Sequence, residues 1–235
     1  YTIGVSAGAT TGISYAARQR GRARYSNIDL MKQYDYVGLK TFIKQRNIMD
    51  FNLLFNVFPK KIYPFDYQTY FNSPERFIMV TSNCLTGEAV YLEEKQDEKR
   101  VLDICVATCS LPLLCPIAYV DGIPMVDGGV CDALPIRKSE ADGNSRNVIV
   151  LTRNKGYRKP DKQQILPGFV FRKYPELRRE LMLRYQRYNE TIEYIEQLEA
   201  EGRALVIRPI RDIVVDRIER DVDKLASLYE EGYAC

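Results

Sequence analysis

The segment best suited to chemistry lies at the start of the chain, where Ser6 stands between Gly4 and Gly8 in a Gly-x-Ser-x-Gly pattern. The apolar residues before it predict the end of a buried strand, and the small residues from Ala7 onward predict a helix. A serine at such a sharp bend has strained backbone geometry and an outward hydroxyl, while glycines at positions 4 and 8 avoid collisions between strand and helix. The helix N-terminus, with the Ala7 N–H, offers unpaired donors and a partial positive charge that favour an oxyanion. Ser6 is therefore our candidate nucleophile.

The absence of histidine limits what could activate this serine. Neither a Ser-His-Asp triad nor a Cys-His pair can be built, so the base must be a carboxylate or a lysine. Asp127 is the best candidate because Gly128 and Gly129 follow it and leave room for a close backbone approach. An aspartate has an ordinary pKa of about 3.9, and burial beside a hydroxyl raises the pKa of such a group. An ordinary Asp-Gly-Gly turn is the alternative interpretation of these residues.

The composition excludes several classes of protein. A formal net charge of +3 leaves no basic footprint for nucleic acid. The six cysteines show no Cys-x-x-Cys spacing and no clustered set of metal ligands, which indicates reduced thiols in a cytoplasmic protein without a metal site. The longest uncharged run, 104–120, contains Pro112 and Pro116 and is too short for a membrane span.

Apolar runs alternate with helical patterns along the chain, which predicts an α/β fold in three layers, with a largely parallel central sheet and helices on both faces. We expect one domain over residues 1–235, with a mainly helical C-terminal part, 153–235, packed on it. The turn Asp121-Gly122 predicts the hairpin that delivers Asp127. The expected strands cover residues 1–5, 77–81, 88–92, 117–120, 124–126, 148–151 and 204–207. The expected helices cover residues 7–19, 36–45, 66–71, 97–109 and 175–201, followed by a last helix with an apolar stripe at Ile218, Val222, Leu225 and Tyr229.

The stretches 4–9, 107–116 and 126–135, in this order and at this separation, resemble the patatin-like phospholipases, particularly their bacterial branch. The resemblance implies a patatin-like fold and a Ser-Asp dyad that acts on acyl esters of lipids without metal or organic cofactor. It assigns the nucleophile of the elbow to Ser6 and the proton acceptor to Asp127.

The chain departs from the family pattern at the oxyanion hole. The family places a glycine-rich loop before the elbow, and nothing glycine-rich precedes Ser6 in this sequence. We therefore expect that the native N-terminal strand and its glycine-rich loop lie upstream of Tyr1. The Ala7 N–H alone supplies one donor, and the loss of a donor typically lowers the rate by about a hundred- to a thousandfold.

Three functions remain open at this point. The first is hydrolysis of phospholipid or lysophospholipid acyl esters through an acyl-enzyme on Ser6. The second is acyl transfer by the same fold, with an alcohol in place of water, and the third is a catalytically weak lipid-binding or regulatory domain. A lipid partner also predicts transient contact with membrane surfaces. The arginines of 18–24 and the apolar group of 51–58 are candidates for it, while a solvated turn and plain core are the alternative interpretations of these two segments.

Overall fold

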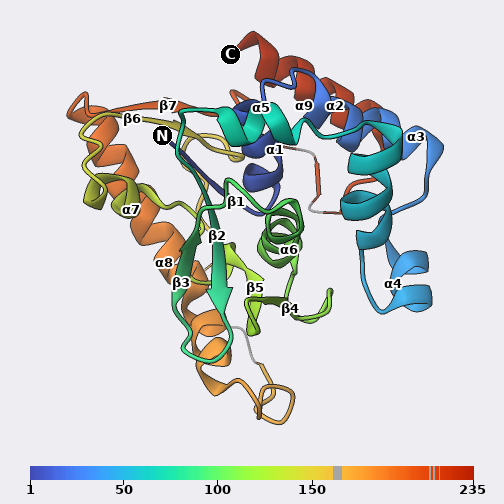
Figure 1. Ribbon diagram of the computed structural model, residues 1–235. Helices are drawn as coiled ribbons and strands as arrows, with labels where there is room; N and C mark the ends of the chain where they lie inside the picture. The colour runs from blue at the N-terminus through green and yellow to red at the C-terminus, as the bar shows by residue number, and fades with distance from the viewer. Residues whose placement is uncertain (161–165, 212, 214, 217) are drawn as a thin grey trace.

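A mixed sheet lies at the centre of the computed structural model, which describes residues 1–160, 166–211, 213, 215, 216 and 218–235 (Figure 1). Within these residues five strands form the sheet, and its middle strand is β2 (Phe77–Asn83). β1 (Thr2–Val5) runs parallel to β2, whereas β3 (Ala89–Leu92) and β5 (Ile123–Asp127) run antiparallel to it. β4 (Ala118–Val120) pairs antiparallel with β5 at the edge.

The predicted α/β fold with helices on both faces is confirmed, but the sheet is mixed and not largely parallel. The reason lies in two short connections. The segment after β2 returns directly as β3, and Asp121-Gly122, both with positive φ, joins β4 to β5. Such tight turns can connect only antiparallel strands.

Successive residues of β5 point to opposite faces of the sheet, as the period of two in a strand requires. Met125 packs on one face with the core beneath α1 (Ala7–Ala16) and α6 (Glu98–Cys109). Val126 packs on the other face with Leu177 and Leu181 of α8 (Pro175–Ala200). The N-terminal end of α8 is therefore joined to the sheet by apolar contacts.

The strands β6 (Asn147–Val150) and β7 (Ala204–Ile207) form a parallel pair of their own, with α8 between them in the chain. The sequence predicts both strands, and their apolar runs indicate burial, but only one face of the pair is covered. Val148, Val150 and Leu205 are exposed, whereas Ile149 and Val206 pack against Ile195 of α8 and its neighbours. α7 (Ile136–Ala141) leads into β6.

A helical segment joins α1 to β2. It contains α2 (Arg22–Arg24), the π-helix η1 (Tyr25–Asp29), α3 (Leu30–Gln33), α4 (Leu39–Gln45), the π-helix η2 (Leu53–Ile62) and α5 (Tyr67–Asn72).

Arg22 holds part of this segment together and is not a surface residue. It is 4% exposed, its guanidinium lies 4.5 Å from the Phe58 ring centroid, and it donates hydrogen bonds to the carbonyl oxygens of Tyr63 and Pro64. Phe58 is buried with Leu30, so this part of the apolar group of 51–58 is core.

The last helix, α9 (Val222–Ala234), begins later than the sequence pattern indicates. Ile218 lies before the helix and packs on the cluster around Leu30 and Phe58. Asp221 caps the helix, since its carboxylate accepts from the N–H groups of Asp223 and Lys224. None of the residues of α9, all of them described, is buried.

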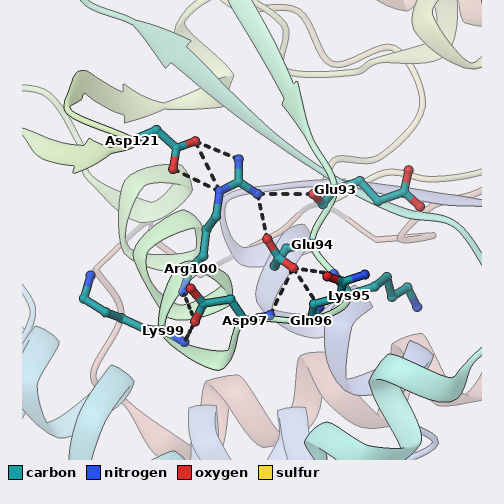
Figure 2. A network of polar contacts seen from close by, with 8 residues as sticks. All are labelled: Glu93, Glu94, Lys95, Gln96, Asp97, Lys99, Arg100 and Asp121. Carbon is teal, nitrogen blue, oxygen red and sulfur yellow. Dashed lines mark hydrogen bonds and ion pairs between the residues drawn. The ribbon is translucent and has the colours of Figure 1, made fainter.

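A network of polar contacts fixes the start of α6 against the β4–β5 hairpin (Figure 2). Asp97 caps the helix by accepting from the N–H groups of Lys99 and Arg100, at 2.8 and 3.3 Å. The Arg100 guanidinium donates to Glu94 at 2.9 Å and to Asp121 at the hairpin turn at 2.8 Å. The helix and the hairpin are thereby tied together at the end far from Asp127.

We predict that Asp97→Ala lowers the free energy of unfolding by about 1 kcal/mol, because two N–H groups at the helix start lose their acceptor. Asp97→Asn retains an acceptor and should lose less. Urea unfolding followed by circular dichroism measures both, and equal stabilities of the Ala variant and the parent would contradict the capping role.

Candidate active site

Ser6 occupies the bend between β1 and α1 that the sequence predicts. Its φ of 53° and ψ of −122° lie in a region that non-glycine residues rarely adopt. Its carbonyl oxygen accepts from the N–H groups of Ala9 and Thr10, which begins the helix directly behind it. Ala7 is exposed and opens α1, so its N–H points out of the first turn without an acceptor one turn back.

Thr108, near the end of α6, stabilises the strained bend through hydrogen bonds of its hydroxyl. The Ser6 N–H donates to Thr108 Oγ1 at 2.8 Å, and this hydroxyl donates in turn to the Val80 carbonyl oxygen at 2.6 Å. Thr108 is fully buried. Its side chain therefore couples the elbow to the middle strand of the sheet.

The ends of β1 and β5 meet head to head on one edge of β2. In the parallel ladder Val5 lies opposite Val80, and in the antiparallel ladder Asp127 lies opposite Thr81. Since Val80 and Thr81 are consecutive, the C-terminal ends of both strands converge at one point of the sheet. The structure thus brings Ser6, which directly follows Val5, together with Asp127.

Asp127 is fixed on several sides. It is 5% exposed, and its carboxylate accepts from the Gly129 N–H at 2.7 Å. Its own N–H donates to the Ser110 carbonyl oxygen, and its carbonyl oxygen accepts from the Ser82 hydroxyl, both at 2.9 Å. The loop at the end of α6, β5 and β2 therefore all orient this residue.

The glycines of the two motifs have different roles. A Cβ on Gly4 would lie 2.7 Å from the backbone of α1, and a Cβ on Gly128 would lie 2.3 Å from the Val80 carbonyl oxygen. A Cβ on Gly129 would lie 3.0 Å from Asp127 Oδ1. The prediction that Gly8 also avoids a collision is wrong, since a Cβ there, directed outward from the exposed first turn, would meet nothing within 4 Å.

The buried thiol of Cys109 interacts with both candidate groups, and no pattern in the sequence predicts it there. Burial raises the pKa of Cys109 well above its ordinary value, the charge of Asp127 adds to this, and a hydrogen bond from the Ser6 side chain opposes it. The pKa of Cys115 is raised to about 11, mainly by burial. Both thiols stay protonated at neutral pH. Cys109 lies on the apolar stripe of α6, and nothing in that pattern separates a residue beside a site from ordinary core.

The described residues contain no group of three or more Cys, Asp or Glu side chains gathered as metal ligands. None of the helices formed by the described residues has the length and apolar character needed to cross a bilayer.

Residues 1–138 match the family model of patatin-like phospholipases, which is more than half of the chain. The chain belongs to the patatin-like phospholipase family. Members of this family hydrolyse acyl esters of lipids. Both Ser6 and Asp127 lie within the matched residues.

A second family model, a domain of unknown function (DUF6363), matches residues 174–235, which include α8, β7 and α9. No curated protein matches the chain. In this patatin-like protein the helix α8 of the second region packs against Val126 and Val130, next to the Asp127-Gly128-Gly129 motif.

The two elbow glycines give a matched pair of variants. We predict that Gly4→Ala lowers the free energy of unfolding by about 2 kcal/mol, because its Cβ would overlap the backbone of Gly8 and Ala9. Gly8→Ala should leave stability unchanged or raise it by up to about 1 kcal/mol, since alanine favours the helix. Urea unfolding of both variants tests this, and equal losses would show that the two positions are equally crowded.

We further predict that Thr108→Val lowers the free energy of unfolding by about 2–3 kcal/mol, because it leaves the Ser6 N–H and the Val80 carbonyl without this partner. Thr108→Ser keeps the hydroxyl and loses one methyl group, which costs about 1 kcal/mol. If the valine variant were as stable as the serine variant, the hydroxyl would not hold the bend.

Proposed function

We propose that this patatin-like protein hydrolyses acyl esters of phospholipids or lysophospholipids with a Ser-Asp dyad, in which Ser6 is the nucleophile and Asp127 the proton acceptor. The observation that carries the proposal is the convergence of two strand ends on Val80 and Thr81. This convergence supports a short distance between the Ser6 hydroxyl and the buried Asp127 carboxylate. The chain has no histidine that could act as the base instead.

In the proposed mechanism Ser6 Oγ attacks the ester carbonyl carbon while its proton passes to Asp127. The resulting oxyanion accepts a hydrogen bond from the Ala7 N–H and is favoured by the N-terminus of α1. The intermediate then expels the alcohol, which takes the proton from Asp127. Water attacks the acyl-enzyme, Asp127 takes its proton and returns it to Ser6, and the fatty acid leaves.

The strain at Ser6 supports its role as the reacting group. A φ of 53° on a non-glycine residue persists only where the surroundings impose it, and here the Thr108 hydroxyl and the first turn of α1 do so. Holding the hydroxyl at a fixed position lowers the entropy that must be lost in the transition state. Gly4 and Gly128 allow the backbone to come this close.

The decisive experiment compares the parent with Ser6→Ala and Asp127→Asn in the hydrolysis of a short-chain nitrophenyl ester and of a lysophospholipid. We predict that each variant lowers kcat/KM by at least about a thousandfold, because the nucleophile and its base act as a unit. Ser73→Ala and Asp121→Asn, which replace the same residue types outside the site, serve as matched controls and should retain the parent's activity.

Labelling by a fluorophosphonate probe gives a second measurement that does not need turnover. The parent and both control variants should be labelled, and Ser6→Ala should not. Hydrolysis by both site variants at the parent's rate would refute the dyad. Lipid binding without labelling or turnover would favour the lipid-binding alternative.

A further inference from the structure

The helix α4 presents two adjacent stripes to solvent. Leu39 and Ile43 are 68% and 74% exposed, although both side chains are large and apolar. Lys40 and Lys44, each one position further along, are exposed as well. Because residues four apart lie on the same side of a helix, the apolar pair and the basic pair form two neighbouring rows. The opposite side of α4 is anchored by the buried Thr41.

Within the part of the chain that the structure describes, no carboxylate pairs with the positive charges of this face. No acidic residue occurs between Tyr36 and Met49, and Arg46 adds a third cation directly after the helix. Over the described ranges none of Lys40, Lys44 and Arg46 takes part in an ion pair.

The acidic residues that flank this segment have other partners. Asp35 pairs with Arg220 at 2.7 Å. The Asp50 carboxylate accepts from Gln45 Nε2 at 3.1 Å and from the Leu53 N–H at 2.9 Å. Neither carboxylate is therefore directed to the cations of α4.

The position of α4 links it to the candidate active site. The Gly38 N–H, at the start of α4, donates to the Ile48 carbonyl oxygen at 2.9 Å, and the Ile48 N–H donates to the Leu114 carbonyl oxygen at 2.8 Å. Leu114 belongs to the loop after α6 that begins at Ser110, the acceptor of the Asp127 N–H. Figure 1 shows α4 at the outer edge of the helical segment, on the side of β4 and this loop.

We propose that α4 docks the protein on the surface of an anionic lipid bilayer, with Leu39 and Ile43 between the headgroups and Lys40, Lys44 and Arg46 on their phosphates. A short helix with one apolar row and an adjacent basic row matches the chemistry of such a surface. Two apolar side chains make too small a face for a stable protein interface, which buries about 1,000 Å² or more. They suffice for weak, reversible attachment.

This docking face differs from the two segments that the sequence suggested. In the stretch 18–24, Arg22 is buried and turned toward Phe58. In the stretch 51–58, Phe58 itself is buried, whereas α4 combines exposed apolar side chains with cations that form no ion pair among the described residues. The benefit of α4 docking to catalysis rests on the proposed function, since docking beside the loop of residues 110–116 would bring lipid esters close to Ser6.

The test is sedimentation of the 235-residue chain with vesicles of phosphatidylcholine mixed with phosphatidylglycerol, and with vesicles of phosphatidylcholine alone. We predict binding to the mixed vesicles that weakens at high salt, because salt screens exposed charges. Lys40→Gln with Lys44→Gln should weaken this binding by about tenfold or more, since each basic residue near an anionic surface contributes about fivefold. Leu39→Ser with Ile43→Ser should weaken it by at least about tenfold.

Val148→Ser with Val150→Ser is the matched control, because it removes two comparably exposed apolar side chains from β6, which Figure 1 shows on the opposite side of the molecule from α4. This variant should bind vesicles like the parent, and circular dichroism confirms that all variants are folded.

The proposal is overturned if the parent does not bind the mixed vesicles, or if the α4 variants bind as well as the parent. Binding depends on no catalytic group, so Ser6→Ala should sediment like the parent and a failed dyad would not affect this result. Hydrolysis of a soluble short-chain ester should be equal in the parent and the α4 variants.

Discussion

The shared edge of β2 is the constraint on which the rest of the structure depends. One edge of a strand usually pairs with one neighbour along its whole length, but here β1 takes residues up to Val80 and β5 takes those from Thr81 onward. Two strands of opposite direction can share an edge in this way only if both end where they meet. Their C-terminal ends, with Ser6 and Asp127, are therefore forced together by the hydrogen bonds of the sheet itself.

The Val80 carbonyl oxygen is the fixed point at this junction. It accepts from Thr108 Oγ1, and the backbone of Gly128 lies so close to it that no side chain fits at position 128. Through Thr108 the same oxygen is connected to the Ser6 N–H. The elbow, the Asp-Gly-Gly turn and the end of α6 are thus all positioned relative to one backbone atom, which makes the geometry of the site a property of the core and not of flexible loops.

The sequence predicts those features of this arrangement that are local. The strand, bend and helix around Ser6, the hairpin with Asp121-Gly122 and the apolar stripe of α8 all appear where their patterns indicate. The pairing of strands is not local, so the mixed sheet and the separate β6–β7 pair could not be obtained from apolar runs alone. The contact between Thr108 and Ser6 could not be predicted for a related reason. A threonine in an amphipathic helix predicts nothing about a hydroxyl that reaches the backbone of a residue 102 positions away.

The buried thiol of Cys109 affects the distribution of charge around the candidate dyad. Cys109 lies within reach of both Ser6 and Asp127, and burial together with the charge of Asp127 keeps its thiol neutral. A thiolate at this place would put a second negative charge beside the carboxylate and disfavour both. Because burial raises the pKa of this thiol, it does not act as a base, and under the proposed mechanism the Asp127 carboxylate takes the proton of the Ser6 hydroxyl. Under the same proposal, a neutral neighbour of low polarity would strengthen the interaction between Ser6 and Asp127, since water in its place would screen it.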